Sequence, residues 1–260
     1  MQRACLTDTH AHLCDPSLRG DLQNLISRAK QNGVGTIISV SENLEEAKAN
    51  LELGRNYRGI AAAAGLYPAN AGRDAAEALE ELIRNNREEL SALGEVGLDY
   101  RLAEAEEERE LQREVLTRFI RLSLELDLPL NVHSRSAGRH AADLLIEQGA
   151  RRVQMHAFDG KAASAKAAVE AGYFFSVPPS ISRSRQKQKL VRQLPLSCLL
   201  LETDSPVLGP SPEEPNEPAN LTVSLRAIAE VKQISEEEVR QAAEENTRRL
   251  YGELPAFAGT

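Results

Sequence analysis

Short apolar runs alternate with longer amphipathic stretches along most of the chain. In the amphipathic stretches apolar residues recur at steps of three and four, as at Leu111, Val115 and Phe119, which indicates helices that bury one face. The short runs predict strands. Eight strands are expected, over Ala4–Thr9, Thr36–Val40, Ile60–Leu66, Ala92–Gly97, Leu130–His133, Val153–His156, Tyr173–Val177 and Cys198–Thr203.

The ends of several predicted helices carry their own signals. Gly33, Gly149 and Gly172 each precede an expected strand, where a glycine can end a helix in the left-handed conformation. Ser235 and Glu238 have the spacing of a capping box and predict the start of a last helix.

Strands that alternate with helices imply parallel β-α-β units. Eight such units close most simply into a (β/α)8 TIM barrel, which needs about 250 residues, and the chain has 260. No linker interrupts the pattern, so residues 1–260 are expected to form a single domain. The alternative is an open doubly wound sheet, but no glycine-rich dinucleotide fingerprint follows the first strand. The proline-rich stretch Gly209–Pro218 is expected to be a loop on the catalytic face of the barrel.

Composition narrows the classes of function. The net charge of −8 argues against a protein that covers duplex DNA with a broad basic face, but not against an enzyme that binds a strand end with a few local cations. No apolar run is long enough for a transmembrane helix, and Met1–Leu6 lacks the apolar core of a secretion signal. Cys5, Cys14 and Cys198 have no paired spacing, which favours a reducing, cytoplasmic location. Cys198 itself is expected in the core.

Four of the five histidines and two carboxylates lie at the ends of predicted strands. Because the carboxyl ends of barrel strands meet at one face, these six side chains are expected to gather there. Imidazole and carboxylate groups together bind divalent metal ions. Each residue alone is as well explained by a structural role, and the set of six is what favours a metal site. The candidate ligands are His10, His12, Glu95, His133, His156 and Asp204.

The spacing of these residues suggests roles for them. His10 and His12 are two apart in an extended segment, so both rings can face one ion. Glu95 has two oxygens and can bridge two ions, whereas His133 and His156 would bind the second. Asp204 is a candidate ligand of the first ion and could also accept a proton from an attacking water, which makes Glu95 and Asp204 the candidate catalytic residues. The alternatives are a capping or ion-pairing Glu95 and an Asp204 that caps a turn.

Basic residues near the same face are candidate phosphate contacts. Arg101 follows the fourth strand, and Arg135 and Arg139 precede a helix, although a solvated helix start explains the latter pair equally well. A basic cluster after the seventh strand could steer an anionic chain, or could simply be a solvated helix face. The cluster comprises Arg183, Arg185, Lys187, Lys189 and Arg192. His140 fits no part of the set and is expected at the surface.

Five motifs resemble those of the TatD family of metal-dependent deoxyribonucleases, which belongs to the amidohydrolase-like barrel superfamily. They are Asp8–His12, Gly94–Asp99, His133, His156 and Glu202–Pro206. The stretches 131–139, 156–160 and 173–190 are most similar to the third vertebrate paralogue of that family and its bacterial relatives. The resemblance implies two divalent metal ions that activate a water, and a 3′-to-5′ exonuclease that acts on the ends of single-stranded DNA.

The chain departs from the family pattern at two positions. Tyr67 stands in Gly65-Leu66-Tyr67-Pro68 where many members have a histidine near the scissile phosphate. The stretch Glu214–Pro218 lacks an arginine that many members have there. By the resemblance, Tyr67, Arg101 and Arg135 would contact phosphate oxygens.

Two other kinds of function remain open. The same ligand set can serve a hydrolase of a small ester, lactone, amide or phosphomonoester, and a barrel can also persist as a scaffold without turnover. The six intact ligands argue against a scaffold. The nitrogen-rich set suits zinc, manganese, nickel or iron, and its carboxylates also admit magnesium. A monomer without an obligatory protein partner is the default expectation.

Overall fold

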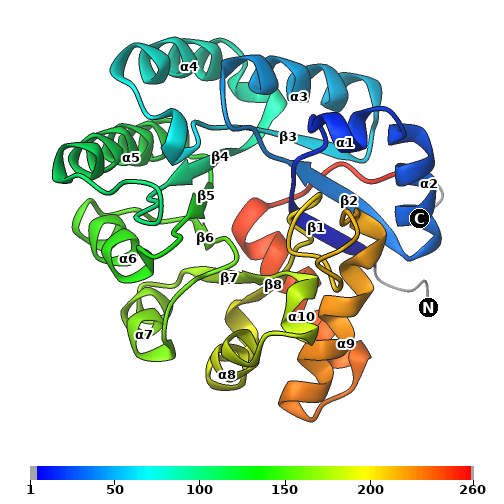
Figure 1. The fold of residues 1–260 in the computed structure, drawn as a ribbon. Helices are drawn as coiled ribbons and strands as arrows, with labels where there is room; N and C mark the ends of the chain where they lie inside the picture. Colours follow the sequence, from blue (N-terminus) through cyan, green and yellow to red (C-terminus); the bar gives the residue numbers. More distant parts are fainter. Residues whose placement is uncertain (1–4, 259–260) are drawn as a thin grey trace.

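The computed structural model describes residues 5–258, and eight parallel strands form its centre. The strands pair in sequence order, and helices surround them on the outside (Figure 1). Their bounds are β1 Leu6–Ala11, β2 Val34–Ser39, β3 Ile60–Ala64, β4 Leu90–Gly97, β5 Leu130–His133, β6 Val153–Met155, β7 Phe174–Val177 and β8 Leu199–Leu201. The architecture is the predicted (β/α)8 barrel.

The first and last strands meet at the mouth of the barrel. A parallel bridge joins Ala11 to Ser205, and the backbone amide of Asp204 donates to the carbonyl oxygen of His10 at 2.8 Å. The barrel is thus nearly closed, which excludes the open doubly wound sheet. These contacts also explain why β1 extends beyond the predicted end at Thr9, to Ala11. Ala4, the predicted first residue of this strand, lies outside the described residues.

The helices are α1 Pro16–Arg19, α2 Leu22–Gln31, α3 Leu44–Asn56, α4 Arg73–Asn85, α5 Glu106–Leu126, α6 Gly138–Glu147, α7 Ala162–Glu170, α8 Arg185–Gln193, α9 Leu221–Lys232 and α10 Glu236–Tyr251. Gly33, Gly149 and Gly172 have φ of +80°, +71° and +85°, so each occupies the left-handed conformation that the sequence predicted. The capping box of Ser235 and Glu238 is present at the start of α10.

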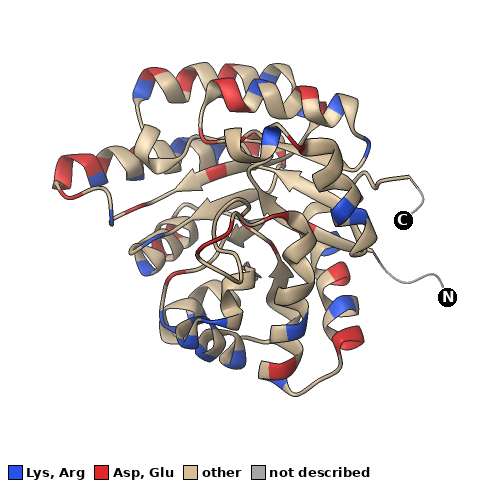
Figure 2. Cartoon of the chain, turned by 45° about the vertical axis from the view of Figure 1, so that its right-hand side comes forward, with Lys and Arg blue, Asp and Glu red and all other residues tan. Residues whose placement is uncertain are grey.

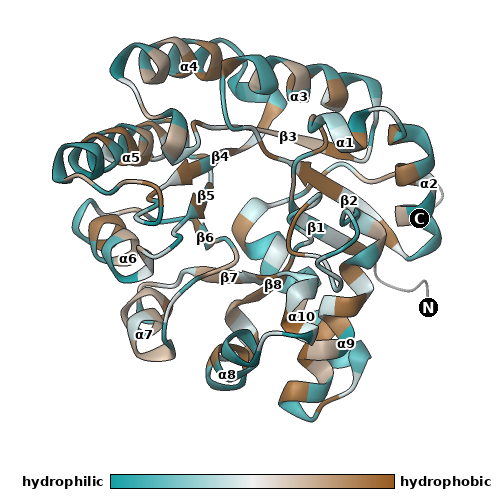
Figure 3. Cartoon of the chain, viewed as in Figure 1, coloured by the Kyte–Doolittle hydropathy of each residue, from teal (hydrophilic) through white to brown (hydrophobic). Residues whose placement is uncertain are grey.

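Two apolar layers hold the barrel together. The outer layer lies between strands and helices, and α5 is hydrophobic toward the strands and hydrophilic on its outer side (Figure 3). The inner layer fills the barrel with small and branched residues, among them Ile38, Ala61, Ala63 and Leu200. Leu250 and Tyr251 from the end of α10 pack into this inner layer, so the last helix of the described chain completes the interior.

The surface and the cysteines agree with the composition. Acidic and basic residues are spread over the outer helices, with few on the strands (Figure 2). Within residues 5–258 no helix is long and apolar enough to cross a membrane. Cys5, Cys14 and Cys198 are free thiols. Cys198 is buried as expected, but it belongs to a 3-10 turn, Leu196–Cys198, and not to β8, which begins at Leu199.

Candidate metal centre

All six predicted ligands converge at the carboxyl ends of the strands. His10 lies in β1 and His12 directly after it, Glu95 lies in β4 and His133 ends β5. The remaining two, His156 and Asp204, follow β6 and β8. Each therefore reaches the mouth of the barrel from a different strand end, apart from the His10–His12 pair.

One group of ligand atoms forms around Asp204. Its Oδ1 lies 3.4 Å from Nε2 of His10 and 3.5 Å from Nε2 of His12. The Nε2 atoms of the two imidazoles are 3.2 Å apart, and Oε2 of Glu95 lies 3.5 Å from Nε2 of His12. His10 and His12, two residues apart in an extended backbone, thus point to the same side of the strand.

A second group forms around the other oxygen of Glu95. Its Oε1 lies 2.6 Å from Nδ1 of His133 and 3.6 Å from Nε2 of His156. Ligand atoms of Glu95, His133 and His156 lie within 4.8 Å of one another, and so do those of His10, His12 and Glu95. The two oxygens of Glu95 therefore face two different groups, which is the geometry expected of a bridging carboxylate.

Close packing of β4 on β5 brings Glu95 to His133. Gly97 has a φ of +153°, and a Cβ there would lie 2.0 Å from the carbonyl oxygen of His133. Only glycine permits this approach. The Gly-Glu-Val-Gly motif thus has a steric reason as well as a chemical one.

Three of the histidines are oriented by acceptors on their outer nitrogens. Nδ1 of His10 donates to the side-chain oxygen of Asn131 at 2.8 Å, and Nε2 of His133 donates to Asp99 at 3.2 Å. His156 donates through Nδ1 to Glu202 at 2.9 Å. When that nitrogen carries the only proton of the ring, the other nitrogen can present its lone pair to a metal ion at the centre. That arrangement fits a divalent metal ion.

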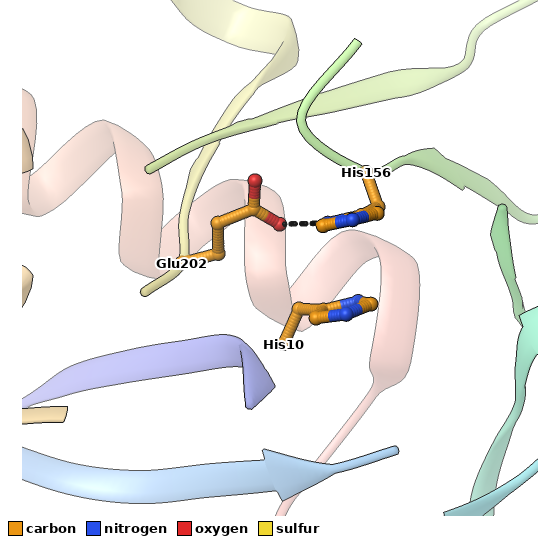
Figure 4. Close-up of side chains that lie close together, drawn as sticks. All are labelled: His10, His156 and Glu202. Carbon is orange, nitrogen blue, oxygen red and sulfur yellow. Dashed lines mark hydrogen bonds and ion pairs between the residues drawn. The ribbon is translucent and has the colours of Figure 1, made fainter. Parts of the chain in front are cut away.

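Glu202 orients His156 and is poorly suited to bind a metal itself (Figure 4). Its carboxylate also accepts the hydroxyl of Ser176 at 2.5 Å and the backbone amide of Ala157 at 2.9 Å. His156 lies beside the Glu202 carboxylate, and the ring of His10 stacks on that of His156 with centroids 3.6 Å apart. Ligand atoms of His10, His156 and Glu202 do lie within 4.8 Å of one another, but the glutamate oxygens are already occupied.

A buried hydrogen-bond network connects two of these oriented histidines through the barrel interior. Asn131, which holds His10, also donates to the hydroxyl of Tyr251 at 3.3 Å, and that hydroxyl donates to Gln154 at 2.6 Å. Gln154 donates to Ser176 at 2.9 Å, and Ser176 reaches Glu202. Asn131, Gln154, Ser176 and Tyr251 were not predicted from the sequence to support the site. Only the inward register of a strand could have suggested the first three, and nothing local marks Tyr251.

Burial and charge oppose each other in the cluster. Burial lowers the pKa of His10, but Asp204 and Glu95 outweigh it and raise that pKa to about 10. Glu95 and Asp99 likewise raise the pKa of His133 to about 9 against burial. In return, the histidines hold the pKa values of Glu95 and Asp204 well below their usual range, although burial alone would raise them. Without a bound metal, His10 and His133 would therefore be protonated at neutral pH, and a metal ion would displace those protons.

Five of the six predicted ligands border a cavity of about 550 Å³, and Tyr67 and Arg135 also line it. The sixth, His10, is fully buried and does not line the cavity. Of the three predicted phosphate contacts, Arg101 is not brought to the cavity. Its side chain is exposed, and its backbone amide donates to Asp99 at 2.9 Å. Arg139 is also exposed and pairs with Asp143. Tyr67, at the position where many family members have a histidine, donates its hydroxyl to Asp99 at 3.0 Å. Asp99 is also the hydrogen-bond partner of His133.

The loop after β8 forms another part of the cavity wall, and a buried side chain anchors it. Val207 and Leu208 border the cavity. The buried side chain of Asn216 donates to the carbonyl oxygens of Thr203 and Val207, at 2.7 and 2.9 Å. This amide ties the proline-rich stretch to the segment that carries Asp204, although the stretch lacks the family's arginine. His140 is exposed, as predicted.

A barrel with imidazoles and carboxylates at its carboxyl mouth defines a metal-dependent hydrolase, and the comparisons agree. The family described as "TatD related DNase" matches residues 7–252. Human deoxyribonuclease TATDN3 is 45% identical over 262 residues, which cover 96% of this chain and 95% of that protein. The metal-dependent hydrolase YabD of Bacillus subtilis is 33% identical over 257 residues, which cover 95% of this chain and 98% of YabD. The chain belongs to the TatD family of metal-dependent hydrolases.

The solved structures place the same barrel in that family. The structure of the TatD homologue YJJV from Escherichia coli matches with a TM-score of 0.88 at 30% identity, over 95% of this chain and 98% of that one. A TatD-family hydrolase from Entamoeba histolytica matches with a TM-score of 0.87 at 21% identity, over 96% of this chain and 99% of that one, which supports the fold alone.

Proposed function

We propose that the chain hydrolyses phosphodiester bonds of DNA, and that it removes nucleotides from the 3′ end of single strands. The observation that carries the proposal is the shared carboxylate, because the two oxygens of Glu95 face two groups of ligand atoms. The name of the human relative, a deoxyribonuclease, supports DNA as the substrate.

Two divalent cations would fit the centre. His10, His12, Glu95 and Asp204 would hold one, and Glu95, His133 and His156 the other. When bound, such a pair polarises the phosphate and makes a water more acidic. The ion could be zinc, magnesium, manganese or a similar metal, because the donors are both imidazole nitrogens and carboxylate oxygens.

The chain's own residues would position the substrate and move the proton. Asp204 would remain ionised beside the histidines and accept the proton of the attacking water. Its Oδ1 faces His10 and His12, whereas Oδ2 lies 3.9 Å from Nε2 of His156, so the two oxygens can serve different roles. Arg135 would bind a phosphate oxygen at the rim, and Tyr67 would support His133 through Asp99.

The setting of this activity is also a proposal. We infer a single-domain monomer that acts in the cytoplasm on DNA strand ends and needs no membrane or obligatory protein partner. The three free thiols are consistent with a reducing compartment.

Removal and return of metal test the function. The chelated protein should lose hydrolysis of a single-stranded oligonucleotide, and magnesium, manganese or zinc should restore it. Small esters, lactones, amides and phosphomonoesters, assayed in parallel, test the alternative. Metal-dependent turnover of one of these without turnover of DNA would replace the proposal with a small-molecule hydrolase, and no turnover of any substrate would favour a scaffold.

A further inference from the structure

Lys187 differs from the rest of the basic cluster in its surroundings. It lies in the first turn of α8, where Ser184 caps its backbone amide at 3.3 Å. It shares the inward side of the helix with Leu190 and Val191, which are buried, whereas Arg185 and Lys189 are exposed. Lys187 also lines the same cavity as five of the six candidate metal ligands.

Within residues 5–258, one hydrogen bond holds the ammonium of Lys187 beside the centre. Its Nζ donates to the carbonyl oxygen of Ala157 at 3.3 Å, and Ala157 directly follows His156. Among the described residues, no carboxylate forms an ion pair with Lys187. An ammonium has three donors, so two remain for another partner.

Two of the acids whose charges act on Lys187, Asp159 and Glu202, have other partners. Asp159 accepts Gln186 on one oxygen, at 3.1 Å, and the backbone amide of Ser136 on the other, at 3.2 Å. Glu202 is occupied by His156, Ser176 and Ala157, as described above. Lys187 could therefore bind an anion in the cavity without breaking an ion pair with Asp159 or Glu202.

Electrostatics supports such an anion. Burial lowers the pKa of Lys187, an effect that Glu202, Asp204 and Asp159 oppose from a distance. A cation that is partly removed from water without a paired anion costs free energy. An anionic ligand in the cavity would offset that cost.

We propose that Lys187 binds an oxygen of the phosphate group that is cut, on the side of the cavity opposite Glu42 and Tyr67, and so contributes to substrate affinity. This inference rests on the proposed function, because it takes the substrate to be a phosphodiester. The phosphate would lie between the candidate metal centre and Lys187, with the apolar side chains of Leu190, Val207 and Leu208 beside the attached nucleoside.

Binding of a product-like nucleotide tests the proposal without turnover. Calorimetry would measure the affinity of metal-loaded protein for thymidine 5′-monophosphate, with thymidine as the phosphate-free probe. Lys187→Met keeps the aliphatic stem and removes the charge, and it should weaken binding of the nucleotide at least about tenfold, which is the usual effect of a lost hydrogen bond to a charged group. Thymidine binding should not change, and Lys187→Arg should retain most of the nucleotide affinity.

Lys189→Met is the matched control, because it removes one charge from the exposed side of the same helix and should bind the nucleotide like the wild type. Metal content and thermal unfolding of all variants should match. If Lys187→Met is unstable, Lys187→Gln takes its place. Nucleotide affinity of the Met or Gln variant within twofold of the wild type would overturn the inference. A wild type that binds the nucleotide but cuts no DNA would refute the proposed function, and the comparison of Lys187 variants would still decide the contact.

Discussion

Both carboxylate oxygens of Asp8 accept hydrogen bonds from Thr203, one from its backbone amide at 2.8 Å and one from its hydroxyl at 2.5 Å. Both residues are buried, and they connect β1 to the segment after β8. Thr203 precedes Asp204, whose φ of +57° is left-handed. The Asp8–Thr203 contact therefore closes the barrel and fixes the backbone that presents Asp204 to the centre.

Thr203→Val should lower the free energy of unfolding of the metal-free protein by about 1–3 kcal/mol, because Asp8 loses a donor in a buried site. Urea unfolding would measure the change. Thr222→Val, at a partly exposed position in α9, has the same change of shape and should have little effect. Equal stability of the two variants would refute the structural role of the hydroxyl.

Glu202→Gln should weaken metal binding about 10- to 100-fold, because His156 loses the carboxylate that orients its ring and increases its basicity. Competition with a chromogenic chelator would measure the affinity. Glu253→Gln removes an exposed acid and serves as the control. Unchanged affinity in Glu202→Gln would show that this outer contact does not support metal binding.

Metal affinity should rise with pH between about 7 and 9. The pKa values of about 10 for His10 and about 9 for His133 mean that both rings are largely protonated in the metal-free protein at neutral pH. A metal must displace those protons, and raising the pH toward these values removes them beforehand. Calorimetry in two buffers with different ionisation enthalpies would count the protons released. Binding without proton release at pH 7 would contradict the assigned protonation.

Arg135→Met should raise KM for a DNA oligonucleotide several-fold, because Arg135 borders the cavity and its charge can meet a phosphate. Arg101→Met removes the same charge from a residue outside the cavity and should leave KM near the wild-type value. Steady-state kinetics at two salt concentrations would measure both. Equal effects of the two substitutions would mean that Arg135 acts only through the general field of the protein.

The sequence predicted the features that depend on periodicity and on strand ends. Alternating strands and helices led to the barrel, and His133 and His156 lay where strand ends placed them. The sequence could not predict contacts that need the closed barrel. Tyr251 contacts Asn131 and Gln154, which are 120 and 97 residues away in the sequence. It can do so only because the end of α10 packs into the barrel interior. Likewise, Arg101 and Arg135 both follow strand ends, but only Arg135 lines the cavity. The paths of the two loops cause this difference, and the sequence does not reveal them.

The central claim is that the mouth of the barrel cuts DNA through the shared carboxylate of Glu95. The most direct measurement is metal-dependent release of mononucleotides from single-stranded oligonucleotides labelled at the 3′ or the 5′ end. We predict stepwise loss from the 3′ end for the wild type and for Glu77→Ala, an exposed control, and no release for a folded Glu95→Ala. No release by the wild type with magnesium, manganese or zinc, or full activity of Glu95→Ala, would contradict the account.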